Sequence, residues 1–335
     1  MIKNAAPVIA HYSGISRALA FRYAGAGIIF GLHGICHNDA SDPDEFLRCP
    51  ERVLEQTLSW VRRNGIEIVG IDDAIDRLTR LSARRFCVFT FDDGYLDNLT
   101  RALPIMESYQ APFTVYVATG MLTGELDAWW LGLAALIRNV DHLELPELDC
   151  RIWCGDLASK QKAFVTIRAL IDTKEDGLGA VTKAIAAHGI DSRALARAEG
   201  LNVAQLRQLA ASPLVTIGAH GVRHIKLAGA STADVELEMA GSRRTLEQAI
   251  GREVKHFAYP FGSCGQREVE IARSVGFRTS VTTERGTLFA EHLNHLQALP
   301  RETIWRRDTR SSLRCKVDGT YRAFRSRLGS PIAHL

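Results

Sequence analysis

The sequence predicts an α/β fold built on a mostly parallel sheet, closed as a barrel or left open, with helices around it. Two observations lead to this prediction. Short apolar segments that resemble strands alternate along the chain with segments that resemble helices. At 335 residues, the chain is also long enough for one large α/β domain or two small ones. A helix-rich interval at about residues 129–200 interrupts the alternation, and we interpret it as an insertion or cap.

The elements of the main domain follow from local composition. Phe86–Phe91 is short, apolar and rich in aromatic and β-branched residues, which is typical of a buried strand. Glu51–Arg63 is amphipathic and is followed by Asn64-Gly65, so we expect a helix there. The other expected strands are Ile28–Leu32, Ile66–Val69, Phe113–Ala118, Leu214–Gly218, His256–Tyr259 and Thr279–Thr283. The other expected helices are Asp72–Leu81, a segment from Asp97 or Asn98 to about Tyr109, Val203–Ala210, Ala233–Ile250 and Gln266–Val275.

The chain divides into a short leading segment and one main domain. We expect residues 1–25 to form an N-terminal helical segment and residues 26–335 to form the main domain with its insertion. Within the insertion, the expected elements are a short strand at Cys150–Cys154 and helices at Trp130–Asn139, Phe164–Ile171 and Leu178–Ala187.

Composition narrows the class of protein. The charges balance, with 41 Lys and Arg against 38 Asp and Glu, so nothing in the total points to a nucleic-acid partner. The seven cysteines are scattered and odd in number, which argues against a disulfide scaffold and for a reducing compartment. The first residues lack the long apolar core of a secretory signal, and we therefore expect a cytoplasmic location.

The C-terminal stretch at residues 301–328 is more basic than the rest. It carries nine Lys and Arg against three acids, a net charge of 9 − 3 = +6. A solvated basic face explains this balance most simply. The alternative is a patch that makes peripheral contact with an anionic membrane or a polyanionic sugar.

Two adjacent acids follow the expected strand Phe86–Phe91, in Thr90-Phe91-Asp92-Asp93-Gly94. Burial of carboxylates at the end of a core strand is energetically unfavourable unless a metal ion or a proton neutralises them. Such a pair can divide its work, with one acid ligating a metal and the other acting as a base. Asp-Asp-Gly is also ordinary turn chemistry, so the motif alone leaves both readings open.

Two further motifs follow expected strands. His220 and His224 lie four residues apart after Leu214–Gly218, a spacing that suits one metal ion in a helix or a tight turn. Ligands gather at the carboxyl ends of parallel strands, which favours a metal site over two unrelated histidines. The third motif is Tyr259-Pro260-Phe261-Gly262. It indicates either the simple end of a strand or the floor of a pocket, where an exposed backbone N–H could donate a hydrogen bond to an oxyanion.

At these residues the chain resembles the NodB-like polysaccharide deacetylases of carbohydrate esterase family 4. The resemblance implies a distorted (β/α) barrel of seven or eight mostly parallel strands over residues 26–335. It also implies a divalent metal, most often zinc, with Asp93, His220 and His224 as ligands. Asp92 would be the general base, and the metal and the Phe261 N–H would hold the oxyanion.

The chain departs from the family pattern at several positions. Gly221 stands where Ser or Thr is usual, and Ala258 stands where an Arg often orients the catalytic Asp. We consider Arg301 as the residue that replaces this Arg. The usual C-terminal histidine motif is not recognisable, so we nominate His33, at the end of the first strand, as general acid. The alternative for His33 is a core histidine at a strand end.

The function implied by the resemblance is metal-dependent removal of N-acetyl groups from N-acetylhexosamine units of an oligo- or polysaccharide. One alternative is an amidohydrolase of a small N-acyl or cyclic amide compound. Another is a carbohydrate-binding protein with reduced catalysis. The adjacent Trp129 and Trp130 are candidates for stacking on sugar faces, but they cannot share one helix face, so we expect at least one of them in the core.

Overall fold

Parallel strands form a curled sheet at the centre of the protein. The computed structural model describes residues 8–37, 47–80 and 84–333. From one edge to the other, the strands are β11 (Thr279–Val281), β10 (His256–Ala258), β9 (Val215–Ala219), β6 (Phe113–Val117), β5 (Phe86–Phe91), β1 (Gly27–Leu32) and β12 (Glu302–Thr303). A further short strand, β4 (Glu67–Ile68), pairs in parallel with the start of β5. The expected parallel sheet is confirmed.

One segment of chain connects the two edges of this sheet. Leu299 bridges Val281 of β11 in parallel, and three residues later Glu302 pairs with Phe30 of β1. The Arg301 amide, between these contacts, donates to the carbonyl of Glu284. The sheet therefore curls into the distorted barrel that the family resemblance implies, and Arg301 lies at its seam.

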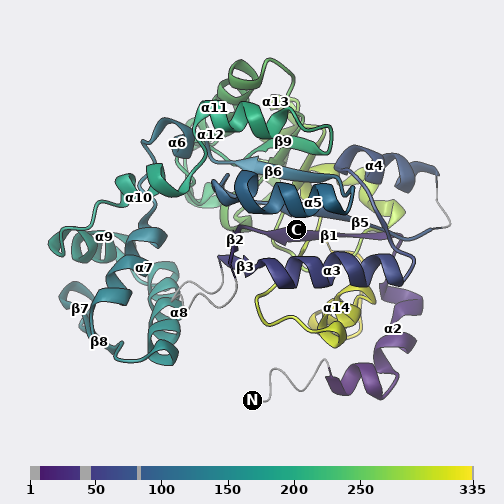
Figure 1. The fold of residues 1–335 in the computed structure, drawn as a ribbon, viewed down its shortest axis with the longest axis horizontal. Helices are drawn as coiled ribbons and strands as arrows, with labels where there is room; N and C mark the ends of the chain where they lie inside the picture. The colour runs from purple at the N-terminus through teal and green to yellow at the C-terminus, as the bar shows by residue number, and fades with distance from the viewer. Residues whose placement is uncertain (1–7, 38–46, 81–83, 334–335) are drawn as a thin grey trace.

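Helices cover the outside of the sheet (Figure 1). They bury apolar side chains against the strands, whose residues are almost all inaccessible to solvent. The covering helices are α3 (Glu51–Arg63), α4 (Ile71–Arg80), α5 (Leu103–Ser108), α11 (Val203–Ala210), α12 (Thr232–Ile250) and α13 (Gln266–Val275). The segment expected to be one helix up to about Tyr109 instead begins as a π-helix, η1 (Asn98–Ala102), which runs into α5.

The expected insertion is a separate helical layer beside the sheet, at the left of Figure 1. It has an apolar cluster of its own, centred on α7. The sequence did not predict β7, which pairs with β8 as an antiparallel hairpin. The elements of this layer are α7 (Trp129–Asn139), β7 (His142–Leu145), β8 (Cys150–Trp153), α8 (Leu157–Thr173), α9 (Gly177–Ala187) and α10 (Ser192–Glu199). The division into domains stays a prediction.

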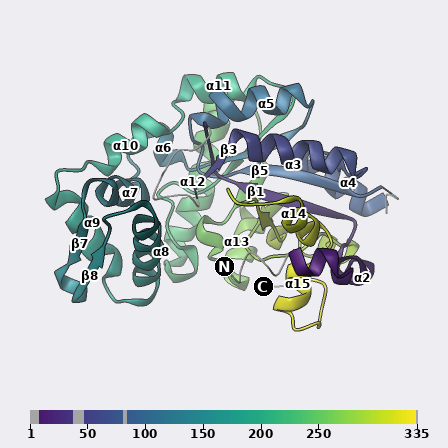
Figure 2. The same cartoon turned by 60° about the horizontal axis from the view of Figure 1, so that its bottom comes forward.

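Two helices near the ends of the described chain pack together on the side of the sheet away from the insertion. Figure 2 shows α2 (Ile15–Tyr23) beside α15 (Thr320–Arg325), and the Ser16 hydroxyl donates to the buried Asp318 carboxylate at 2.6 Å. In the described ranges, no helix combines the length and apolarity needed to cross a membrane. The remaining elements are β2 (Gly34–Cys36), β3 (Arg48–Pro50), α6 (Thr119–Thr123), α14 (Arg310–Val317) and the short 3₁₀ helices Pro146–Leu148, Leu227–Gly229, Pro260–Gly262, Ala290–Asn294 and Leu296–Ala298.

Candidate active site

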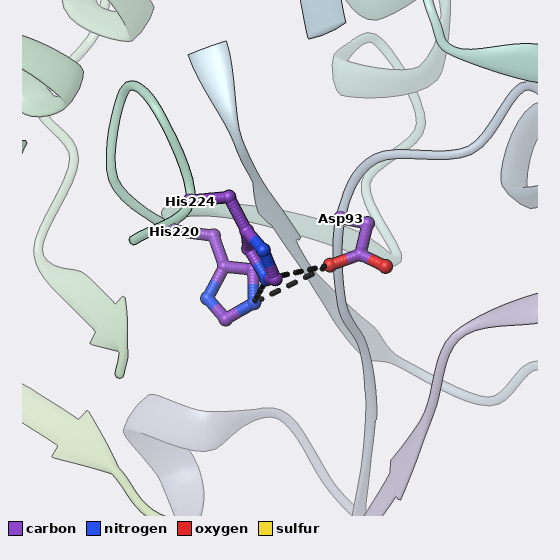
Figure 3. Close-up of side chains that lie close together, drawn as sticks. All are labelled: Asp93, His220 and His224. Atoms are coloured by element: carbon purple, nitrogen blue, oxygen red, sulfur yellow. Dashed lines mark hydrogen bonds and ion pairs between the residues drawn. The ribbon is translucent and has the colours of Figure 1, made fainter. Parts of the chain in front are cut away.

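Three donor atoms converge where β5 and β9 end (Figure 3). The Asp93 Oδ1 atom lies 3.4 Å from His220 Nε2 and 3.3 Å from His224 Nε2. The two Nε2 atoms lie 3.2 Å apart. All three side chains are buried, and the histidines approach through a tight turn, not along a helix. This is the ligand set expected from the sequence, and it is a group that could hold a metal ion.

The backbone around these residues is strained. Asp93, His224 and Phe261 have φ values of 72°, 52° and 59°, in the left-handed region that side chains other than glycine seldom occupy. Eight non-glycine residues of the described chain have positive φ, and these three meet at one site. Backbone strain of this kind persists only where the surrounding structure enforces it, and it is common at functional sites.

Hydrogen bonds fix the orientation of the metal-binding candidates. His220 Nδ1 lies 2.7 Å from the carbonyl oxygen of Ala258, so it carries the proton and leaves Nε2 with a lone pair toward Asp93. Asp93 Oδ1 is buried and, among the described residues, accepts no hydrogen bond of good geometry. Burial raises the pKa of Asp93, but the two imidazoles outweigh this and hold it well below its usual range.

A buried glutamate that the sequence analysis missed supports the histidine turn. Glu238 of α12 is fully buried and accepts hydrogen bonds from the amides of Val222 and Arg223 at 2.8 and 2.9 Å. It also accepts one from Arg223 Nε at 2.7 Å. A side chain at position 221 would meet this carboxylate, since a Cβ there would lie 2.8 Å from Glu238 Oε2. Gly221 therefore allows the turn to close over Glu238.

Asp92 faces Arg301 across the barrel seam. Two nearly parallel hydrogen bonds join them, Nη1 to Oδ1 at 2.7 Å and Nη2 to Oδ2 at 2.8 Å. Arg301 Nε donates to the carbonyl of Thr282, and Nη1 reaches the Thr90 hydroxyl at 3.2 Å. Burial raises the pKa of Asp92, but the Arg301 guanidinium outweighs it and holds that pKa below the usual value.

These groups open into a cavity of about 310 Å³, within the usual size range of small-molecule sites. His33, half-buried at the end of β1, lines it, and so do Trp129 and Phe261. Every residue nominated from the sequence therefore reaches one cavity. The same lining includes Arg168, Arg285 and Trp305, which the sequence analysis did not single out.

Comparison with known proteins gives a consistent result. A family model described as polysaccharide deacetylase matches residues 81–142 and 164–280. The chain belongs to the polysaccharide deacetylase family. The gap in the match falls within the helix-rich insertion. A curated relative, "Putative polysaccharide deacetylase YxkH" of Bacillus subtilis, is 20% identical over 242 residues, which cover 72% of this chain and 60% of that protein.

Several solved structures share the fold. A Streptococcus pyogenes deacetylase, PplD in complex with acetate, is 18% identical, with a TM-score of 0.58 over 85% of this chain and 95% of that one. IcaB from Ammonifex degensii is 16% identical, with a TM-score of 0.55 over 88% and 97%. A Bacillus cereus polysaccharide deacetylase, BC0361, is 15% identical, with a TM-score of 0.54 over 87% and 68%. At these identities the likeness concerns the fold.

Proposed function

We propose that the protein is a metal-dependent hydrolase that removes N-acetyl groups from N-acetylhexosamine units of an oligo- or polysaccharide. The observation that carries the proposal is the pairing of two buried acids in different environments. Asp93 faces two imidazoles and Asp92 faces a guanidinium, at one cavity. Family membership supports the substrate class.

The residues present fit a divalent cation, and we propose zinc. Ligand bonds of about 2.0–2.1 Å in a tetrahedral site put donor atoms about 3.3 Å apart. The three separations between donors here are 3.2, 3.3 and 3.4 Å. Asp93, His220 and His224 would hold the ion. When bound, it would polarise the acetamide carbonyl and acidify a water molecule.

Asp92 would act as the general base. Its pKa lies below the usual value, so it is ionised at neutral pH and can accept a proton from the attacking water. The two hydrogen bonds from Arg301 leave each carboxylate oxygen with a remaining lone pair for this task. Arg301 would thus orient Asp92 in place of the arginine that is absent at position 258.

His33 and Phe261 would complete the cycle. The imidazole of His33 lies at the same cavity and would donate a proton to the leaving amine as the C–N bond breaks, which releases acetate. The backbone N–H of Phe261, on a turn held at positive φ, would donate to the oxygen of the carbonyl that is attacked. Trp129 would stack on a sugar face, while Trp130 is buried in the insertion.

Metal content tests the first requirement of this proposal. Purified protein should bind about one equivalent of zinc, and Asp93→Asn should lose it, because one of three ligands is removed. Asp92→Asn is the matched control, since it changes the neighbouring acid and should keep the metal. Equal zinc content in all three proteins would contradict the assigned ligands. An amidohydrolase of small amides would pass this test and fail on sugar oligomers, and a carbohydrate-binding protein would fail both tests.

We also propose a cytoplasmic location and peripheral contact with an anionic membrane. All seven cysteines lie in the described part of the chain and none forms a disulfide there, as expected in a reducing compartment. Arg301 and Lys316 of the basic stretch are buried and cannot reach a membrane. Three of its arginines, at 322, 325 and 327, lie on or next to α15, beside Arg17 and Arg22 of α2. Exposed apolar side chains accompany them, namely Val8, Ile9, Tyr12, Ile15, Phe21, Phe324 and Leu328.

Vesicle binding tests the membrane contact. The protein should sediment with vesicles that contain phosphatidylglycerol and much less with pure phosphatidylcholine, because arginines favour anionic lipid. Phe21→Ser with Phe324→Ser should reduce this binding about tenfold or more, since two exposed aromatic side chains are removed. Leu157→Ser, which removes an exposed leucine of the insertion, is the control. Binding that survives the double change would contradict this surface.

A further inference from the structure

A second cavity, of about 470 Å³, adjoins the candidate active site. The two cavities share three lining residues, Trp129, His224 and Phe261. The Trp129 and Phe261 rings stack at a centroid distance of 6.5 Å and an interplanar angle of 20°. These two rings and the His224 imidazole therefore form a partition between the cavities, with Asp93 and His220 on the side of the first cavity alone. A molecule that reacts at the first cavity can extend past this partition into the second.

The walls of the second cavity are mainly apolar. They come from the segment before α7, the helices of the insertion, the turn that carries His224 and the turn that carries Phe261. Most of these side chains are partly exposed, so the cavity presents apolar surface to water. Such a hollow beside a reaction site is typical of ligand binding. Besides the two partition rings, the apolar lining residues are Leu126, Ile171, Leu178, Val222 and Ile225.

Two of the five charged lining residues, Arg223 and Lys226, form ion pairs with acids outside the lining. The Arg223 guanidinium binds Glu238 and Asp234, and Lys226 binds Asp172. None of these three acids lines the cavity. The other charged residues of the lining, Glu125, Asp127 and Arg193, are exposed to solvent. The arginine and lysine stems thus add hydrocarbon to the wall.

The apolar lining favours a hydrocarbon chain over a sugar ring as the ligand of the second cavity. A sugar ring would bring several hydroxyl groups, which lose hydrogen bonds to water when they enter an apolar hollow without partners. A hydrocarbon chain has no such cost. An acetyl group, with two carbons, does not need a cavity of this size, so the hydrocarbon must belong to another part of the substrate. Given the proposed function, that part is the group joined to the sugar.

We propose that the second cavity binds the alkyl chain of an amphiphilic glycoside whose N-acetylhexosamine unit reacts at Asp92 and Asp93. This inference rests on the proposed function and names the substrate class, a sugar linked to a lipid-like chain. Leu178 is its specificity residue, since it lies on α9, lines the cavity and is 43% exposed, so a polar replacement leaves the core intact.

Paired substrates test the inference. Methyl and octyl N-acetyl-β-glucosaminide carry the same reacting group. Each methylene removed from water strengthens binding about fourfold, so the octyl glycoside should have a KM at least tenfold lower. Leu178→Asp should remove this advantage and leave turnover of the methyl glycoside unchanged. Leu157→Asp is the matched control, since Leu157 is 41% exposed, begins another insertion helix and does not line the cavity.

Three results would overturn the inference while the proposed function stands. They are equal KM values for the two glycosides, a preference for an N-octanoyl over an N-acetyl methyl glycoside, and a loss of affinity in Leu178→Asp for N-acetylglucosamine oligomers alone. If neither the glycosides nor N-acetylglucosamine oligomers are hydrolysed, the proposed function fails. Calorimetry with decyl maltoside below its critical micelle concentration then tests the alkyl site on its own. Binding that weakens at least tenfold in Leu178→Asp supports the alkyl site, and no binding to the unchanged protein overturns it.

Discussion

Arg301 donates hydrogen bonds to both carboxylate oxygens of Asp92, although it lies 209 residues further along the chain. The contact exists because the segment from Leu299 to Glu302 bonds to β11 at one end and to β1 at the other. The residue that orients the proposed base is thus part of the seam of the barrel. In this chain, the segment that closes the sheet also places Arg301 beside Asp92.

Replacement of Arg301 should impair turnover without loss of the metal. Arg301→Lys keeps a positive charge but cannot make the two parallel hydrogen bonds. We expect kcat to fall about 10²-fold, because misplacement of a catalytic group by about 1 Å has effects of this size. Zinc content should not change. Arg84→Lys, at an exposed arginine, is the control. Zinc lost together with activity would assign Arg301 to metal binding instead.

Glu238 should strengthen the binding of metal, although it is not itself a ligand. Glu238→Gln weakens the acceptor that holds the amides of Val222 and Arg223, so the turn between His220 and His224 loosens. We expect the zinc Kd to rise about tenfold, in the range known for groups that support metal ligands. Competition with a fluorescent chelator measures it. Asp234→Asn removes the outer partner of Arg223 and should change the Kd little. If both variants bind zinc as the unchanged protein does, Glu238 has no such role.

His33 should be needed to protonate the leaving amine. His33→Ala should lower kcat about 10²-fold or more, since general acids contribute on this scale. His37→Ala is the control, because that side chain is exposed on the same segment. The loss should be smaller for substrates whose leaving amine is less basic, as such amines need less protonation. A near-normal rate for His33→Ala would mean that His33 is not the general acid and is only a core histidine at a strand end.

Glu302 should make stability depend on pH. Its side chain is buried, and burial raises its pKa from 4.5 to about 7. The folded protein then holds this proton more tightly than the unfolded chain, so the free energy of unfolding falls as pH rises from about 4.5 to 7. The loss is on the order of 3 kcal/mol at most.

Urea unfolding at pH 5 and pH 8 checks this behaviour. Glu302→Gln cannot ionise, so its stability relative to the unchanged protein should be higher at pH 8 than at pH 5. Glu236→Gln, at an exposed glutamate, should show no such difference between the two pH values. A constant difference for Glu302→Gln would mean that this carboxyl group titrates normally.

Local sequence was sufficient for the elements with strong patterns. The apolar run Phe86–Phe91 and the amphipathic helix Glu51–Arg63 have the bounds expected, because burial decides both. The acids and histidines after β5 and β9 were also recognisable, since parallel strands bring their carboxyl ends together. The motifs could thus be located from residue type and strand order, whereas the assignment of Asp93, His220 and His224 as ligands came from the resemblance to the family.

The contacts that support the site and complete the fold could not be predicted from local sequence. Strand β12 has two residues and no period, and it exists only because the sheet curls back to meet β1. Glu238 looks like any polar position of an amphipathic helix, yet it is fully buried under the histidine turn. Strand β7, which pairs with the expected strand β8, lies within the segment that lacks strong apolar runs. Each of these depends on tertiary packing, which no window of sequence contains.

Acetate release from N-acetylglucosamine oligomers tests the central claim most directly. The protein, freed of metal by a chelator and dialysed, would be assayed alone and with one equivalent of zinc. We expect no acetate without metal, release on addition of zinc, and none from Asp93→Asn under the same conditions. Acetate at the same rate with and without metal, or none from any oligomer while a small amide is hydrolysed, would contradict the account.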